Sequence, residues 1–427
     1  MPYASGRAAA LSRALRRDES AGGMNSIASP SVPQPLRRSL LASPSAALFM
    51  CVFTSQAGIL VLSPILVDVA RDFGVSTAVA GQLRIVAAPV AALVAIAVAR
   101  AGARLPYRLL LAGGAGLVAA GSVASAVAPS FEALAIAQVP LWIGVSTLVA
   151  GGIGAAGAWS TPEGRTRLVA RSLAGAPAAW IVGMPTIGWV ADTDWRLAFL
   201  AVPLPAAVAT IGLVAALRTG KPERRAAPSL FRLLRAPRAG WWAIGELLAM
   251  SAWTGTLVFS GALFVETYGA SPRLTGILLA TMAAAYLAGN VLGGRMRGAC
   301  ARRALAWSNV AAAVGVALMW PVTPNVLVTL ALFGLAAAIV AARTVTGTTY
   351  GFKIGGERKL EVGAARAVLT HVGYLAGSLL GGAALAIGGD AAVGIAFGSL
   401  FLAAAAPYLV TWSTRCEIRP RVGLAPA

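Results

Sequence analysis

Long apolar runs, almost free of charged residues, alternate with short polar segments from residue 44 to residue 414. A helix needs about 20 apolar residues to cross the roughly 30 Å hydrocarbon core of a bilayer. The runs lack the two-residue alternation of a membrane barrel strand, so we predict helices. Nine runs have the required length: Pro44–Val67, Leu109–Phe131, Ala133–Pro162, Ser172–Ala191, Leu197–Leu217, Leu247–Val265, Leu274–Gly294, Ala367–Gly389 and Ala391–Thr414.

Three more spans follow from the remaining apolar sequence. One covers Val75–Ala99 and is interrupted only by Arg84. The run Ala304–Ala342 is too long for one crossing, and Pro321–Asn325 within it is typical of a turn, so we divide this run into two spans. The pattern therefore predicts an all-α membrane protein with twelve transmembrane helices.

Lys and Arg gather in every second connection between the predicted spans, as they do in cytoplasmic loops. The alternate connections hold only three basic residues, Arg71, Arg196 and Arg273. A missed or extra span would shift this alternation out of phase, and it stays in phase along the whole chain. It therefore supports the count of twelve and predicts that both termini lie in the cytoplasm.

The longest basic connection divides the spans into two sets of six. Arg100 and Arg108 follow the second span, and Arg295 and Arg303 follow the eighth with the same spacing. Chance similarity between Ala- and Gly-rich helices is the alternative, but we predict two halves related by pseudo-two-fold symmetry, as in membrane folds built from repeats. The predicted division is a disordered cytoplasmic tail at 1–43, a six-helix half at 44–217, a cytoplasmic basic linker at 218–238, a second half at 239–414 and a cytoplasmic tail at 415–427.

Composition agrees with a chain that lies in the bilayer. Hydrophobic residues make up 58% of the chain and charged residues only 12%, about half the charged share of a soluble domain. The net charge of +20 does not indicate nucleic-acid binding, because the basic residues lie in connections between spans. Three widely spaced cysteines and one histidine predict no disulfide framework, metal site or cofactor. No nucleophile motif or phosphate loop is present, so we predict a protein that is not an enzyme.

Three segments resemble a known family over nearly the whole of Pro44–Thr414. Ser63–Leu83 is similar to the first outer loop of the major facilitator superfamily, and Trp195–Phe199 is similar to the start of its sixth span. Gly183–Gly188, with Gly175 before it, resembles the fifth-span motif of antiporters, although Met184 stands where that motif has Gly. The resemblance is to the twelve-span branch of bacterial drug and metabolite exporters.

The resemblance implies a secondary transporter of the bacterial inner membrane that moves a small organic solute by alternating access. It implies proton-coupled efflux, with uptake of a small metabolite as the nearest alternative. A non-transporting sensor or scaffold is the alternative from another class, but such a protein usually needs a soluble domain. We also predict that the chain is a monomer in the lipid bilayer.

Ionisable groups inside a membrane are costly and indicate function. The seventh span begins nearer Trp241 and so includes Glu246, which carries a proton, binds a cation or pairs with Arg343. Arg84 binds an anion or pairs with Asp68 or Asp72, and His371 takes part in proton coupling or makes a simple hydrogen bond. The uncharged candidates for a polar and aromatic cavity, or for helix-to-helix hydrogen bonds, are Gln56, Gln138, Asn290 and Trp253.

Glycines at four-residue spacing predict close helix contacts, because a missing side chain lets backbones approach. We expect them to permit rocking of the halves, with static packing as the alternative. Pro185 frees backbone groups, and so predicts a bend in the fifth span. The gating and packing candidates, including those of the antiporter-like segment, are Gly175, Gly183, Pro185, Gly188, Gly289, Gly293, Gly373, Gly377 and Gly381.

Overall fold

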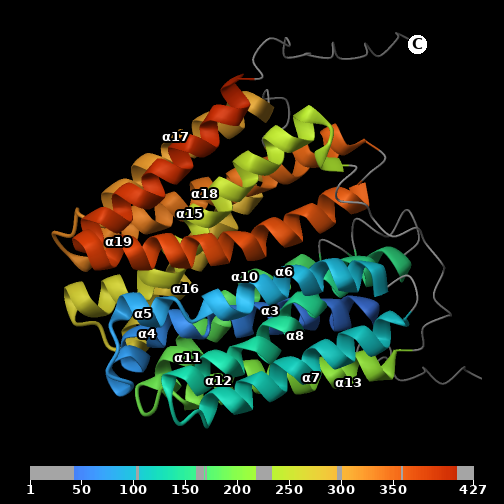
Figure 1. The fold of residues 1–427 in the computed structure, drawn as a ribbon, viewed down its shortest axis with the longest axis horizontal. Coiled ribbons are helices and arrows are strands. Elements are labelled where there is room, and N and C mark those ends of the chain that lie inside the picture. Colours follow the sequence, from blue (N-terminus) through green and yellow to red (C-terminus); the bar gives the residue numbers. More distant parts are fainter. Residues whose placement is uncertain are drawn as a thin grey trace, which may run out of the picture. The chain divides into compact units, whose positions relative to one another are not determined.

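The computed structural model describes residues 43–101, 105–159, 168, 171–217, 233–295, 301–356 and 359–410. All of these residues belong to one compact unit, Leu41–Ala427. The regular structure of this described part is helical throughout, which confirms the all-α prediction (Figure 1). The predicted C-terminal tail, nearly all of the N-terminal tail and residues 218–232 of the linker lie outside the described residues.

The first six predicted spans correspond to helical segments in chain order. Several segments are divided by short irregularities, most clearly in the fifth span, where the π-helical turn η1 lies between two α-helices. The segments are α3 (Pro44–Leu60) with α4 (Leu62–Asp72), α5 (Thr77–Gly81) with α6 (Arg84–Ala101), α7 (Tyr107–Ala126), α8 (Phe131–Ala158), α10 (Gly175–Ala178) with η1 (Ala179–Gly183) and α11 (Met184–Ala191), and α12 (Leu197–Ala201) with α13 (Pro203–Ala216).

The second set of spans is built from longer helices. These are α15 (Pro237–Tyr268), α16 (Pro272–Arg295), α17 (Ala301–Met319), α18 (Val326–Gly355) and α19 (Lys359–Val410). The backbone leaves the helical region inside α19 at Gly388 and Gly389, where Gly389 has a φ of 61°. Such a conformation favours glycine, and it divides α19 into two helices at the position where the sequence predicts a loop.

Polar side chains begin several of the helices. Ser43, Ser76 and Ser130 accept hydrogen bonds from backbone N–H groups in the first turns of α3, α5 and α8. Asn325 caps α18 in the same way, with its Oδ1 atom 3.0 Å from the backbone nitrogen of Val328. Each cap satisfies an N–H group that the first turn leaves without a partner.

Within the described residues, nine helices are long and apolar enough to cross a membrane. One of the nine, Glu361–Leu409, contains the break at Gly388 and Gly389. The remaining predicted spans correspond to α17 and to α6, whose apolar part Pro89–Val98 is shorter. The chain is a multi-pass membrane protein.

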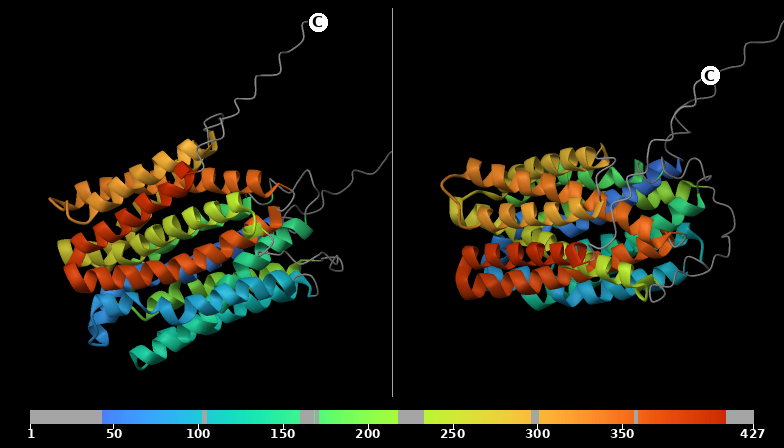
Figure 2. Two further views of the ribbon diagram at one scale, coloured as in Figure 1. Left: turned by 45° about the horizontal axis from the view of Figure 1, so that its top comes forward. Right: turned by 90° about the horizontal axis from the view of Figure 1, so that it is seen from above.

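The helices form two groups that follow the order of the chain. Helices coloured blue to green lie together, and helices coloured yellow to red lie together, in Figure 1 and in the left view of Figure 2. The contacts that join the groups lie mainly between α10–η1–α11 and α16, between α19 and the helices α5, α6 and α8, and between α4 and the helices α15 and α16. We call the two groups the first half and the second half.

Candidate functional site

Glu246 is the centre of a buried ion cluster in the second half. Its Oε1 atom lies 2.9 Å from Arg343 Nη1, and its Oε2 atom lies 2.6 Å from Arg366 Nη1. The hydroxyl of Tyr408 donates to Oε1 at 3.3 Å. The side chains of Glu246 and Arg343 are at most 1% exposed, whereas that of Arg366 is 18% exposed. One carboxylate is therefore shared by two cations from α18 and α19.

Arg343 is also held by groups other than Glu246. It donates from Nε to Asn309 Oδ1 at 3.1 Å and from Nη2 to the Gly245 carbonyl at 3.1 Å. Asn309 in turn donates to the carbonyl of Ala404 at 3.2 Å. The cluster thus links α15, α17, α18 and α19. Of the three sequence interpretations of Glu246, pairing with Arg343 is present in the structure.

A glycine lets α18 approach this carboxylate. A Cβ atom at Gly347 would collide with Oε1 of Glu246, so that only a residue without a side chain leaves the carboxylate in place. The carbonyl of the same residue accepts a hydrogen bond from Trp242 Nε1 at 3.0 Å. The position of the carboxylate is therefore set from α18 as well as from its own helix.

A second cluster lies where the two halves meet, and we call it the interface cluster: Arg84, Trp142, His371 and Tyr374. The Arg84 guanidinium lies 5.9 Å from the Trp142 ring centroid and 5.2 Å from that of Tyr374. Trp142 meets the rings of Tyr374 and His371 edge-on at 5.4 Å and 6.0 Å. Arg84 and Trp142 come from the first half, and His371 and Tyr374 from α19.

The structure does not show the predicted pairing of Arg84 with an acidic residue. Its Nη2 atom instead donates to the carbonyl of Ile59 at 2.6 Å. Asp72 pairs with Arg196 at 2.5 Å, and Oδ2 of Asp68 has no hydrogen-bond partner among the described residues.

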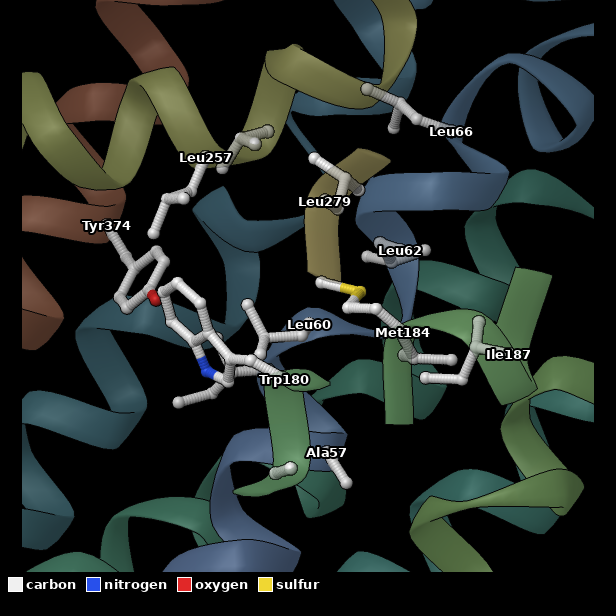
Figure 3. Close-up of a cluster of buried hydrophobic side chains, with 14 of the residues drawn as sticks. Ala57, Leu60, Leu62, Leu66, Trp180, Met184, Ile187, Leu257, Leu279 and Tyr374 are labelled. Carbon is white, nitrogen blue, oxygen red and sulfur yellow. The ribbon is translucent and has the colours of Figure 1, made fainter. Parts of the chain in front are cut away.

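Aromatic side chains continue from this region into the second half. Trp180, from η1, donates to Gln56 Oε1 at 3.1 Å, and its ring centroid lies 5.8 Å from that of Tyr286. Tyr286 stacks on Trp253 at 5.9 Å, and Trp253 lies 6.1 Å from Phe333. Figure 3 shows Trp180 and Tyr374 among apolar side chains of both halves. Gln56 and Trp253 are thus parts of one aromatic and polar path.

The other two uncharged candidates lie elsewhere. Gln138 is buried and donates to Ser125 Oγ on α7 at 2.9 Å, which is a contact within the first half. Asn290 is half-buried on α16. The hydrogen bond of Gln138 corresponds to the second sequence interpretation, the link between two helices.

Among the candidate glycines, Gly188 faces the opposite half. A Cβ atom there would collide with the carbonyl oxygen of Pro272 on α16. The other candidate glycines contact helices of their own half: Gly175 faces α3, Gly183 faces Val202, Gly289 and Gly293 face α18, Gly373 and Gly377 face α15, and Gly381 faces Phe259 and Phe397. Pro185 lies in the first turn of α11, directly after η1.

The sequence profile of the Major Facilitator Superfamily matches residues 48–269, just over half of the 427-residue chain. The chain belongs to the Major Facilitator Superfamily. This finding confirms the resemblance at the level of the superfamily. The members of this superfamily are transporters, and the fold is that of a secondary transporter. A search of curated proteins found no match to the chain.

Solved structures of transporters share the fold of this superfamily member. A bacterial homologue of the human lysosomal transporter Spinster, inward-facing and occupied, aligns with a TM-score of 0.70 at 16% identity, over 93% of this chain and 100% of that one. The same homologue, inward-facing and unoccupied, gives a TM-score of 0.64 at 15% identity, over 88% and 96%. A D-xylose–proton symporter gives 0.67 at 14% identity, over 86% and 96%.

Sequence reasoning missed Arg366 and Tyr408 in this transporter. Arg366 directly precedes the charge-free run Ala367–Gly389, so the sequence alone indicates a position in a connection between spans. Tyr408 lies 162 residues after the carboxylate that it contacts. Arg366 lies 120 residues after Glu246, so no local signal in the sequence predicts either contact.

Proposed function

We propose that this superfamily member has twelve spans in two halves related by pseudo-two-fold symmetry. An axis that exchanges the halves turns the second span into the eighth and the fifth into the eleventh. The contact of α6 with α19 then corresponds to that of α16 with α11, and both contacts are present. In this proposal the protein is a monomer of the bacterial inner membrane, and both termini are cytoplasmic.

The proposed activity is transport of a small organic solute by alternating access, with the solute bound between the halves. The main support for this proposal is that α6 contacts α19 and α11 contacts α16, so that corresponding helices of the two halves meet. Near the connections at 73–76 and 269–271, Thr77 of α5 donates to Glu266 of α15, and a Cβ atom at Gly188 would collide with the Pro272 carbonyl oxygen. This end is the outer one by charge distribution. We therefore propose that the halves are closed at the outer end in the present state.

Glu246 is the proposed proton carrier. In the present state the Glu246 carboxylate pairs with both Arg343 and Arg366, and the partial exposure of Arg366 offers a route for water. Protonation of Glu246 would release Arg366, because a neutral carboxyl group no longer attracts a cation. Export driven by proton entry is the favoured direction, in line with the exporter-like segments, and proton-coupled uptake is the alternative.

The test is a solute screen in proteoliposomes with an imposed proton gradient and a pH dye inside the vesicles. We expect wild type to exchange a solute for protons, and Glu246→Gln to bind solute without moving protons. Glu246→Asp is a second variant that keeps the charge, and Glu132→Gln is the control, since that side chain is exposed at the start of α8. Proton-coupled transport at the wild-type rate in Glu246→Gln would remove Glu246 from the coupling step.

A further inference from the structure

Arg84 is a buried cation without a carboxylate partner among the described residues. The residue is 1% exposed. The carboxylates that form ion pairs within the described residues are Asp72 and Glu246, and neither of them pairs with Arg84. One nitrogen, Nη2, donates to the Ile59 carbonyl, whereas Nη1 has no hydrogen-bond partner in the described part of the chain. A charged group at this depth normally pairs or faces a cavity.

The groups around Arg84 are aromatic rings, which carry no negative charge. Trp142 and Tyr374 present their rings at 5.9 Å and 5.2 Å, and such cation–π contacts offset only part of the cost of burial. His371, which contacts the same Trp142 ring, is 2% exposed, and its Nδ1 atom also has no partner within the described residues. Two unpartnered nitrogens therefore belong to one cluster at the contact of the halves.

The two clusters differ in their charge. In the second-half cluster, Arg343 and Arg366 share Glu246, and both have a counter-ion inside the protein. Arg84 has none among the described residues, although a guanidinium is well suited to bind two oxygens of a carboxylate or phosphate at once. A cationic solute would be repelled at this position, and a neutral one would leave the charge uncompensated.

We propose that the missing counter-ion is the transported solute, an organic anion with an aromatic or apolar body. One carboxylate or phosphate oxygen accepts from Nη1 of Arg84, and the body of the solute packs on the rings of Trp142 and Tyr374. This inference rests on the proposed function and names its substrate class. Arg84 is covered in the present state, so the solute enters when α19, which carries Tyr374, moves away from α6.

The test uses purified full-length protein in phosphatidylcholine vesicles, whose headgroups carry no net charge. The probes are benzoate, indole-3-carboxylate and phenyl phosphate, each matched with a neutral counterpart: benzamide, indole-3-carboxamide and phenol. Binding is followed by tryptophan fluorescence and by the shift in unfolding temperature. We expect at least one anion to bind wild type, and its neutral counterpart to bind roughly ten- to hundredfold more weakly.

Three variants separate recognition from structure. Arg84→Gln should lose the preference for the anion, Arg84→Lys should retain part of it, and Arg196→Gln, which alters a partly exposed arginine paired with Asp72, should behave like wild type. An Arg84 that is only structural would weaken anionic and neutral probes equally in Arg84→Gln. That result, or the absence of anion-selective binding by any probe, overturns the inference.

The two levels of proposal fail differently. Selective binding of an anion by a protein that moves no solute across the vesicle membrane would contradict the transport function and leave the Arg84 site in place. Transport of neutral or cationic solutes at equal rates by wild type and Arg84→Gln would leave transport in place and contradict the anion site. Competition by added phosphatidylglycerol would instead assign the Arg84 site to a lipid headgroup, which also overturns a soluble solute as its ligand.

Discussion

At the scale of single residues, Glu246 and Arg366 contribute unequally to the stability of the ion cluster. Glu246 is the one carboxylate between Arg343 and Arg366 among the residues described, so its loss leaves two cations without a counter-ion. Loss of Arg366 leaves the pair Glu246–Arg343, which is balanced and retains Asn309 as a further partner. Removing one partner of a buried pair is costly because the other charge stays buried and uncompensated.

We therefore predict that Glu246→Gln lowers the free energy of unfolding by about 3–5 kcal/mol, and that Arg366→Gln lowers it by less. The partial exposure of Arg366, at 18%, reduces its contribution further, because water screens the charge. Denaturation of the purified variants in detergent measures both values. In the double variant Glu246→Gln/Arg366→Gln, part of the loss should be regained, and strictly additive losses would contradict a shared carboxylate.

A second prediction concerns the glycine that faces the carboxylate. Gly347→Ala places a methyl group on Oε1 of Glu246, so the carboxylate must shift away from Arg343. Overpacking of this kind costs about 1–3 kcal/mol. Gly334→Ala on the same helix is the control, because its Cβ would lie 3.5 Å from the Ala285 side chain, an ordinary contact. Equal unfolding temperatures for the two variants would show that Glu246 does not need this position.

At the scale of helices, the backbones of α11 and α16 meet at one of the contacts between the halves. Gly188 of α11 and Gly276 of α16 face each other, and a Cβ atom at Gly276 would lie 3.2 Å from the Cα atom of Gly188. Small residues permit this approach. The contact therefore has no room for a side chain while the halves are in the present arrangement.

We predict that Gly188→Leu or Gly276→Leu prevents the halves from closing at this end. The equilibrium between states should then shift toward the arrangement that is open there, because the leucine has space only after α11 and α16 separate. Cysteine labelling of residue 184, introduced by Met184→Cys, would report the opening as faster modification by a water-soluble reagent. Gly212→Leu is the control, since nothing lies within 4 Å of its Cβ position; labelling at the control rate would contradict the prediction.

The sequence predicts the bounds of the helices better than it predicts which helices pack against each other. The eighth span, expected at Leu274–Gly294, is α16 at Pro272–Arg295, because an apolar run ends where charges begin. Gly289 and Gly293 show the limit. Their four-residue spacing identifies a face that another helix approaches, but α18 of the same half, and not the first half, packs on that face. The Arg366 contact is beyond the pattern for the same reason, since periodicity fixes a face and not its partner.

At the scale of the whole molecule, the proposed alternating access requires that the contact between the halves near α5 and the end of α15 break in each cycle. Thr77 of the first half donates to Glu266 of the second half near this end. Thr267 and Asp390 lie close together near the same end, 3.4 Å apart between Oγ1 and Oδ2, but both belong to the second half. A cross-link at Thr77 and Glu266 would therefore join the two halves, whereas a cross-link at Thr267 and Asp390 would lie within the second half.

We predict that cross-linking Thr77→Cys to Glu266→Cys with a short bifunctional thiol reagent abolishes transport, and that reduction restores it. The same reagent on Thr267→Cys and Asp390→Cys should leave transport near the rate of the untreated protein, because α15 and the second part of α19 then move as one body. Both pairs are built in a background in which Cys51, Cys300 and Cys416 are replaced by serine. If the bridge between the halves left the rate unchanged, the solute would have to cross without separation of α5 from α15, and rocking of the halves would not be the mechanism.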